Sequence, residues 1–423
     1  MEHTNKDTHA SHNSLSESRF KILLLLLRTT GIRLNVKSKS AVHIIYSVIL
    51  AVFIHVSILS LYVDTFVQRH QLVELMKKLR LLIATQIVTW MHFSLSYRKR
   101  EVEHLIRLTD YFTWEELPTR DPDTGYLTKA GYLPFIQKLT KYATLFAIIY
   151  HCTQTTVRII LNHDMVFASW YPLEVSESPA YEIANITQAI QTILMIFLFI
   201  GFQSLYATFV CVACSQLEKL RAAILDIRQT YITPEQDCGA ETNKKDGEGH
   251  PRTHEELFGH MQKQLNDCIR HHQKIKRYME ALENAMNLPM CGLFLICLST
   301  MCFAAFSATL SWGDHVDVSQ ALIIYIMVSA CVCQFCWLGN ELSEEAENVR
   351  DAAWGCDWVG TPVPFQRCLI FIIAAANKEF TLTAGKFVPV SNKTMMNMMN
   401  QTLSFFMFLL QMKDKSTDTS QGA

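Results

Sequence analysis

The polar residues of this chain that could do chemistry gather in its last apolar segment, 391–412. At about 1.5 Å of rise per helical residue, this segment is long enough to cross a hydrocarbon layer of roughly 30 Å. An unpaired amide that faces lipid costs on the order of several kcal/mol, so this segment needs either partner helices or water. Interhelical hydrogen bonding and an aqueous pore both remain open on these residues alone. The polar residues of the segment, together with Phe408, recur at spacings of three, four or seven. This spacing places them on one helix face: Asn397, Asn400, Gln401, Ser404, Phe408 and Gln411.

A charged residue and several histidines also lie in or near apolar segments. Arg158 could pair with Asp164 or Glu182, or it could contact a polar ligand. We interpret the histidines of the apolar segments, His43, His55 and His151, as hydrogen-bonded core residues, and we expect His271 and His272 in a solvated loop.

Enzyme chemistry has no support in the sequence. No Ser-His-Asp arrangement, phosphate-cradling glycine loop or pair of catalytic carboxylates stands in a suitable context. Most of the 13 cysteines lie in apolar runs, where a thiol packs as a small hydrophobe, and none is spaced with histidine as in a zinc finger. A net charge of −1 gives no argument for a nucleic-acid partner, because a surface that binds nucleic-acid phosphates needs an excess of Lys and Arg. We therefore predict no catalytic activity, no cofactor, no metal and no nucleic-acid partner.

The elements that must position these residues are membrane helices. Half of the 423 residues are apolar and only 18% are charged, against about 25% charged residues in soluble domains. The run 368–376 has only nine residues, so we expect a buried helix outside the bilayer, beginning after Pro362 and Pro364. Seven other segments are long enough to cross: 41–63, 80–97, 134–162, 183–214, 287–312, 319–338 and 391–412.

The placement of Lys and Arg predicts the orientation of these spans. These residues concentrate in the N-terminal region, in 98–133, in 215–285 and in 339–385, which are therefore expected to be cytoplasmic. With seven spans the amino terminus is then cytoplasmic and the carboxyl terminus extracellular. The predicted organisation is a cytoplasmic tail with a short half-buried helix (1–40), helices one to six with a cytoplasmic helical loop at 215–285 (41–338), a cytoplasmic anchor (339–385), helix seven (386–412) and an extracellular tail (413–423). Within the loop, 237–253 is expected to be disordered.

The carboxyl-terminal third resembles the insect odorant receptors and their co-receptor, Orco. The resemblance rests on 336-CWLGNELSEEAENVRDAAWGCDW-358, 380-FTLTAGKFVPVS-391 and 404-SFFMFLLQMK-413, which lie within roughly the last ninety residues of the chain. The ending is also similar to the Thr-Tyr-x5-Gln-Phe signature of gustatory receptors, with Gln411 retained and Ser404, Phe405 and Met412 as departures.

The resemblance implies an all-α, tetrameric, ligand-gated, non-selective cation channel with seven helices. The seventh helix would line the pore, and the inner ends of helices four to six, with the short helix before the seventh, would form an anchor between subunits. By position, Phe408 and Met412 would form a hydrophobic constriction beside Gln411. The predicted pore residues are thus Asn397, Asn400, Gln401, Ser404, Phe408, Gln411 and Met412.

The resemblance also implies a pocket for small volatile molecules in the outer half of helices two, three, four and six. We choose residues by the helix face on which they lie. The chosen faces carry aromatic and apolar side chains with few polar groups, as a pocket for volatile molecules needs. Ordinary bundle packing remains the alternative for each residue. The predicted ligand-binding residues are Gln86, Ile87, Trp90, Tyr150, Thr153, Val157, Thr192, Met195, Leu322 and Tyr325.

The expected partners follow from the same resemblance. They are Orco in a heterotetramer, a small volatile odorant, permeant cations and membrane lipid, in the plasma membrane of an olfactory neuron dendrite. The alternatives are a homomeric channel of the odorant and gustatory receptor superfamily, the co-receptor itself, a seven-helix G-protein-coupled receptor or a transporter. A G-protein-coupled receptor has the opposite orientation, and no inverted repeat favours a transporter.

Overall fold

A computed structural model describes residues 19–34, 41–67, 72–114, 116–122, 124–162, 165–167, 169–171, 175, 177–227, 254–311 and 315–421. The expected disordered segment 237–253 and the residues Asp164 and Cys238 lie outside these ranges. The described part is almost entirely helical, and a two-stranded ladder is its small departure from an all-α fold. Residues 19–29 are helical. The other elements are α2 (Ala41–Val67), α3 (Leu72–Tyr97), α4 (Lys99–Thr109), α5 (Lys129–Asn162), α6 (Ala180–Leu225), α8 (His254–Leu310), α9 (His315–Gly355), α10 (Val363–Ala376), β1 (Thr383–Ala384), β2 (Val388–Pro389) and α11 (Asn392–Gln421).

Each predicted span falls on one helix: α2, α3, α5, α6, α8, α9 or α11. Within the described residues, four helices are long and apolar enough to cross a membrane by composition, namely Ile44–Val67, Ala180–Leu225, Glu255–Leu310 and Asp317–Gly355. The other three are long but more polar. Lys77, Lys78 and Arg80 lie near the start of α3, and the amide residues lie along α11.

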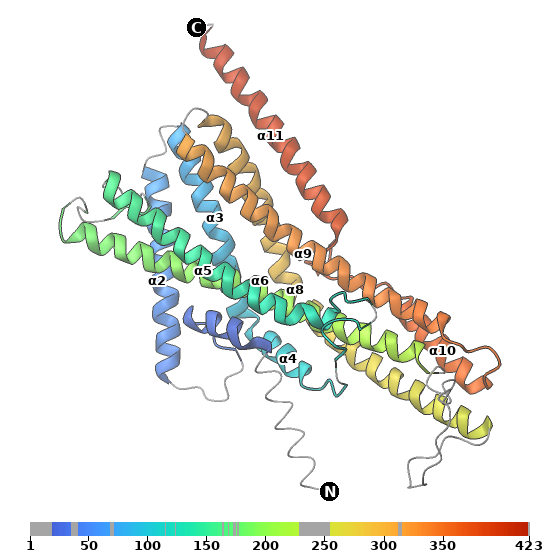
Figure 1. The fold of residues 1–423 in the computed structure, drawn as a ribbon. Helices are drawn as coiled ribbons and strands as arrows, with labels where there is room; N and C mark the ends of the chain where they lie inside the picture. The colour runs from blue at the N-terminus through green and yellow to red at the C-terminus, as the bar shows by residue number, and fades with distance from the viewer. Residues whose placement is uncertain are drawn as a thin grey trace.

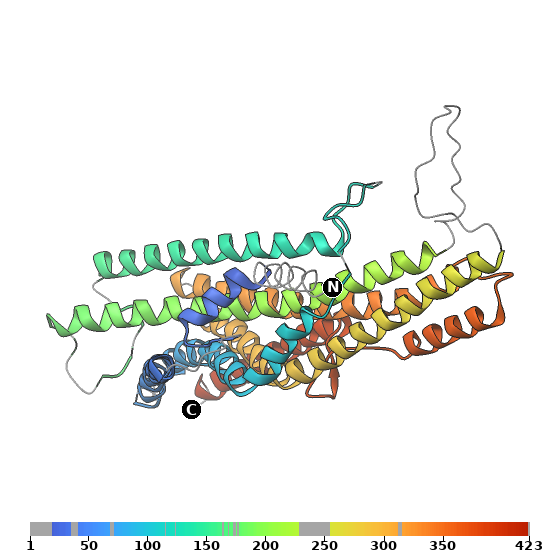
Figure 2. The ribbon, with the colours of Figure 1, turned by 90° about the horizontal axis from the view of Figure 1, so that it is seen from below.

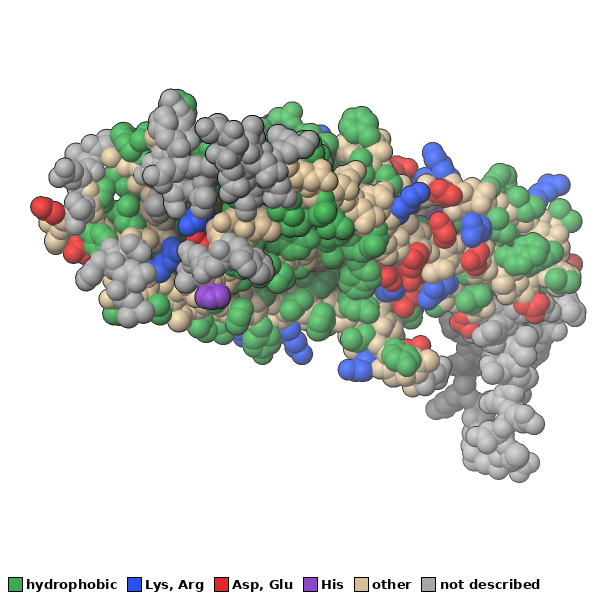
Figure 3. Space-filling model, turned by 90° about the horizontal axis from the view of Figure 1, so that it is seen from above, with side chains coloured by type: hydrophobic (Ala, Val, Ile, Leu, Met, Phe, Trp, Pro, Cys, Tyr) green, Lys and Arg blue, Asp and Glu red, His purple; other side chains and the backbone are tan. Residues whose placement is uncertain are grey.

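Three long helices form the frame of the molecule. α6 packs along α5 and α9, while α8 packs along α3 and α9 (Figures 1 and 2). Two buried tyrosine hydroxyls join these helices. Tyr206 on α6 donates to the carbonyl of Phe335 on α9 at 3.2 Å, and Tyr278 on α8 donates to the carbonyl of Phe209 on α6 at 3.0 Å. From above, an apolar surface separates charged side chains near one end from a second charged group where α8, α9 and α10 extend (Figure 3).

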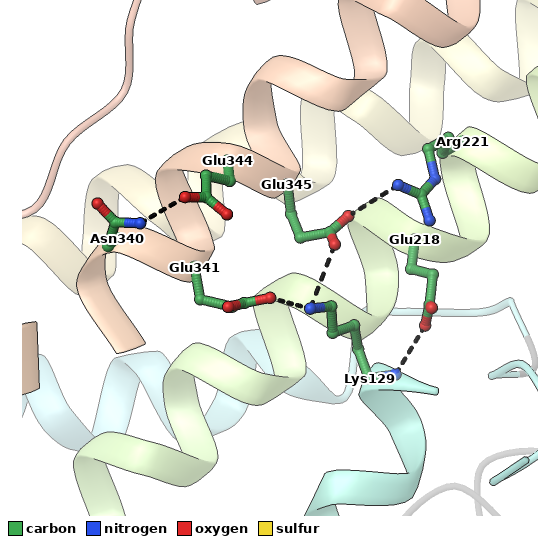
Figure 4. A network of polar contacts seen from close by, with 7 residues as sticks. All are labelled: Lys129, Glu218, Arg221, Asn340, Glu341, Glu344 and Glu345. Carbon is green, nitrogen blue, oxygen red and sulfur yellow. Dashed lines mark hydrogen bonds and ion pairs between the residues drawn. The ribbon is translucent and has the colours of Figure 1, made fainter. Parts of the chain in front are cut away.

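A charged network joins α5, α6 and α9 (Figure 4). The ammonium group of Lys129, at the start of α5, pairs with Glu341 and lies 3.4 Å from Glu345. Glu345 also lies 3.6 Å from Arg221, and the backbone N–H of Lys129 donates to Glu218 at 2.8 Å. Burial alone would lower the pKa of Lys129, but the hydrogen bond to Glu341 and the charge of Glu345 raise it above its usual value. Lys129 is therefore a permanent cation that holds three helices together.

His271 and His272 both lie on α8, so their expected place in a solvated loop was wrong, and His271 is buried. Its ring is 2% exposed, lies on α8 and stacks on Trp114 with ring centres 4.1 Å apart. Neither ring nitrogen has a hydrogen-bond partner among the described residues. Burial, followed by the nearby charges of Lys274, His272 and Lys219, lowers the pKa of His271 to about 4. The helical stretch 255–287 is amphipathic, and His271 lies on its buried face.

The start of α11 is fastened to α8 and α9. Glu283 on α8 accepts hydrogen bonds from the backbone N–H of Thr383, at 2.8 Å, and from its hydroxyl. The tight turn between β1 and β2 uses Gly385, whose φ is +65°, and the Gly385 N–H donates to the carbonyl of Asn287 at 2.8 Å. Gly339 on α9 lies so close to the carbonyl of Val390 that a methyl group there would stand 2.4 Å from that oxygen. These contacts fix where α11 leaves the bundle.

α10 presents one apolar face to the protein and another to its surroundings. It starts after Pro362 with Pro364 in its first turn, and its buried residues follow a helical spacing: Phe365, Leu369, Ile372 and Ala376. On the other side Ile370 is 62% and Phe371 73% exposed. The short helix is therefore half-buried, and the described residues leave one of its apolar faces uncovered.

Candidate functional site: a charged cavity and an exposed polar helix face

A cavity of about 330 Å³, here called the charged cavity, lies at the end of the bundle where α2 and α5 finish and α3 and α9 begin. Its walls come from α2, α3, α5, the segment 166–167 and α9. The polar lining is unusual for a membrane protein: Asp64, Lys77, Lys78, Arg80, Arg158 and Asp317 all reach it. Ionisable groups at membrane depth are costly and mark functional sites more often than packing.

Each of the two carboxylates that line the charged cavity forms an ion pair with a lysine of α3. Lys77 pairs with Asp317 of α9, and Lys78 pairs with Asp64 of α2. Both pairs join α3 to another helix, so they hold the cavity walls in register.

The two arginines of the cavity bond to neutral oxygen atoms instead. Arg80 is 4% exposed and donates through one terminal nitrogen to the hydroxyl of Ser307, at 3.0 Å, and to the backbone carbonyl of Asp317, at 3.3 Å. Arg158 donates to the carbonyl of Val166 at 3.0 Å. The hydrogen bonds of both guanidinium groups thus go to neutral oxygen atoms, and the Asp317 carboxylate, which pairs with Lys77, also acts on the charge of Arg80.

α6 holds one wall of the cavity in place. The backbone N–H of Val166 donates to the amide oxygen of Asn185 at 3.0 Å. Gln188 accepts from the N–H of Phe167 at 2.8 Å and donates to its carbonyl at 3.0 Å. Asn185 is 4% exposed, so a glycan at its Asn-x-Thr sequence would break this clamp.

The predicted ligand-binding residues do not gather in one place. Tyr150 lines the charged cavity. Trp90 instead donates to the carbonyl of Pro289 at 2.8 Å, and its indole covers Gly292, so it serves the packing of α3 on α8. Ile87 is buried in the core and Tyr325 packs against that core. Thr153 and Thr192 donate to carbonyls of their own helices. The remaining members are partly buried or exposed: Gln86, Val157, Met195 and Leu322.

Sequence reasoning found Arg158 but missed the other charged residues of the cavity. A signal was present, because Asp64, Lys77, Lys78, Arg80 and Asp317 all lie within a few residues of an end of a predicted span. Charges at such positions are usually read as contacts with the membrane interface. Only the fold shows that they converge.

α11 separates its buried and polar faces. Thr394, Met398 and Thr402 are buried against the bundle. The predicted pore residues whose side chains are described are all exposed on the single chain: Asn397, Asn400, Gln401, Ser404, Phe408 and Gln411. Met412 lies in the helix, but its side chain is outside the described residues. The polar stripe therefore faces away from its own bundle.

A groove at the base of α11 adds a second surface there. It encloses about 670 Å³ between α8, the β1–β2 turn and α11, and it is largely apolar, with Phe294, Leu298 and Phe387 among its walls. Asn397 and Gln401 reach its edge.

Long apolar helices, a charged cavity at one end and a final helix with an exposed polar face define a multi-pass helical membrane protein. The family model described as "7tm Odorant receptor" matches residues 71–403. The chain therefore belongs to this odorant receptor family.

Individual relatives and a solved structure agree with this assignment. The chain is 23% identical over 277 residues to "Odorant receptor 2a" of Drosophila melanogaster, an alignment that covers 64% of this chain and 66% of the relative. It is 24% identical over 270 residues to "Odorant receptor Or2" of Anopheles gambiae, covering 63% of this chain and 66% of the relative. The chain thus spans slightly less than two thirds of these relatives. The fold is similar to that of the insect olfactory receptor OR5 from Machilis hrabei in complex with eugenol, with a TM-score of 0.69 at 16% identity, over 95% of this chain and 99% of the other.

Proposed function

We propose that this chain is a tuning subunit of an odorant-gated, non-selective cation channel, in which it assembles with the co-receptor Orco. One observation carries the proposal: α11 points the amides of its polar stripe, with Ser404, away from its own bundle. In lipid these groups would lack hydrogen-bond partners, whereas in a pore shared with other subunits they would be solvated. Family membership supports the same arrangement.

The exposed apolar residues support assembly into a larger complex. Trp354, Val359 and Phe371 are each about 70% exposed at the α9–α10 end of the molecule. Apolar patches of this kind mark interaction surfaces. We assign them to contacts between subunits of a tetramer, through the anchor segment 339–385. The concentration of Lys and Arg supports placing this end in the cytoplasm, with the carboxyl terminus outside.

In this proposal the closed pore is a hydrophobic constriction. Phe408 is 56% exposed on the polar face of α11, so each copy of this chain around the channel axis would contribute one ring to the constriction. A narrow apolar ring excludes water and ions, and opening must move it outward. The charged cavity is the proposed odorant site, and a ligand opens the channel only if it binds the open arrangement more tightly than the closed one.

Expression with and without Orco tests this function. Volatile-evoked current within milliseconds in cells without G-protein signalling, dependent on Orco, is the expected result. Current without Orco would instead indicate a homomeric channel. Slow responses that require G proteins would contradict the proposal.

An epitope tag at the carboxyl terminus tests the orientation separately. It should be labelled on intact cells, whereas labelling only after permeabilisation would indicate the opposite orientation. The inserted complex can be checked with the same tag, so a silent channel and an absent channel are distinguishable.

A further inference from the structure

The charged cavity carries more positive than negative charge. Four cationic side chains line it, Lys77, Lys78, Arg80 and Arg158, against the two carboxylates of Asp64 and Asp317. Both carboxylates are already ion-paired with lysines. Among the described residues with a permanent charge that line the cavity, two positive charges are therefore in excess.

Both arginines are held in place by neutral oxygen atoms, and Arg80 shares the charge of Asp317 with Lys77. Arg80 is almost completely buried, and its Nε–H has no hydrogen-bond partner among the described residues. Arg158 is fixed by the carbonyl of Val166, which α6 clamps in turn. Burying more cations than carboxylates is costly, and a bound anion would reduce that cost.

The rest of the cavity wall is aliphatic. Leu61 from α2, Leu81 from α3, and Ile323 and Ile324 from α9 line it beside the charged groups. A planar guanidinium pairs with a carboxylate through two parallel hydrogen bonds, and an aliphatic wall accepts a hydrocarbon chain. The cavity volume of about 330 Å³ lies at the small end of ligand sites.

We propose that the charged cavity selects small aliphatic monocarboxylates, with the carboxylate between Arg80 and Arg158 and the hydrocarbon tail against Leu81 and Ile324. The inference rests on the proposed function, because the response to a ligand is measured as channel current. It names the ligand class of the charged cavity, the proposed odorant site. Its electrostatic basis predicts discrimination by charge: a carboxylate is preferred to a carboxamide, alcohol or aldehyde of the same length.

The test compares matched ligands on the assembled channel. Straight-chain carboxylates of four to ten carbons are applied beside the carboxamides, alcohols and aldehydes of equal length, on cells that express this chain with Orco. We expect the half-maximal concentration for the best carboxylate to be at least about tenfold lower than for its carboxamide, because hydrogen bonds to charged groups contribute more than neutral ones. Equal potency, or a preference for neutral ligands, would overturn the inference while leaving an odorant-gated channel intact.

Variants of Arg158 locate the effect. Arg158→Gln should weaken the carboxylate response about tenfold or more and leave any neutral-ligand response unchanged. Arg158→Lys keeps the charge and should retain part of the preference. Arg107→Gln, which removes an exposed arginine of α4 away from the cavity, is the matched control and should have no effect. If Arg158→Gln shifts all ligands equally, the arginine acts on gating and the inference fails.

A binding measurement separates the two proposals. Carboxylate-dependent thermal stabilisation of the purified complex with Orco, lost in Arg158→Gln, supports the ligand class even if no current is seen, and the failure then belongs to the proposed channel function. Absence of stabilisation by carboxylates at concentrations where neutral ligands stabilise would refute the ligand class.

Discussion

The close approach of Gly339 to the carbonyl of Val390 makes a sharp prediction about the packing of α9 on the segment before α11. In Gly339→Ala the new methyl group would lie 2.4 Å from this oxygen and 2.8 Å from a methyl group of Val390. Contacts below 3.0 Å are not tolerated, so the two segments must separate by at least about 0.6 Å. The backbone of Val390 is itself tied to a neighbouring segment, because its N–H donates to the carbonyl of Leu382 at 2.7 Å.

The expected cost is that of overpacking a well-packed contact, about 1–3 kcal/mol. Alanine also favours a helix over glycine by up to about 1 kcal/mol, which would partly hide this cost. Gly259→Ala is the matched control, because Gly259 lies on α8 with nothing within 4 Å of the added methyl group. The propensity gain is common to both variants, so their difference isolates the steric cost.

Thermal unfolding of the purified complex, followed by tryptophan fluorescence, measures this difference. An unfolding entropy of about 2 cal/mol/K per residue means that 1 kcal/mol moves the midpoint of a chain of 423 residues by about 1 °C. Gly259→Ala should equal or exceed the parent chain, and Gly339→Ala should melt about 1–3 °C below Gly259→Ala. A midpoint for Gly339→Ala at or above that of Gly259→Ala would refute the reasoning.

Three further predictions address the pore, the buried histidine and the charged network. Phe408→Ala should raise the current recorded without ligand, whereas Leu403→Ala, on the same helix but about 140° around it, should not; unchanged basal current in well-expressed Phe408→Ala would argue against the constriction. His271 is neutral in the folded chain, with a pKa of about 4 against 6.5 when unfolded, so its stabilisation is present above pH 6.5 and is lost as the pH falls toward 4. His271→Phe should remove about 3 kcal/mol of acid-induced destabilisation in that window, and an identical pH profile in denaturation experiments would contradict the assignment. Lys129→Met should lower the unfolding midpoint, because it leaves Glu341 without this cation and Glu345 with Arg221 alone. Lys129→Met combined with Glu341→Gln should recover part of the loss, and additive losses in this double-mutant cycle would mean that the pair is not coupled.

The sequence predicted the helices better than the contacts between them. Apolar length and helical periodicity located every predicted span on a helix, because both properties depend on residues close together in the chain. The polar stripe of α11 was read from spacing in the same way, and the structure shows it on the exposed face. Arg158 was identified as a candidate ligand contact because an arginine near the end of an apolar helix needs an explanation.

The charged cavity and the buried histidine needed the fold. Trp90 has the residue type of a pocket wall, yet a glycine on α8, 202 positions further along the chain, gives its indole a place to pack. His271 looked solvated because its neighbours in sequence are polar, and it is buried because Trp114 of a distant segment covers it. Long-range partners of this kind are not encoded in local spacing, so patterns in one sequence cannot reveal them.

α8 runs as one continuous helix from Ser307, which contacts Arg80 of the charged cavity, to the groove at the base of α11. Ser307, near one end of α8, accepts the hydrogen bond from Arg80, while Glu283 and Asn287 hold the turn that leads into α11. These two places are 20 or more residues apart, or about 30 Å along the axis. Pro289 lies between them and cannot donate the backbone hydrogen bond that would stiffen the helix there. A tilt of α8 at its end near the charged cavity would therefore reach the start of α11 only in part, because α8 would bend at Pro289 and take up the rest.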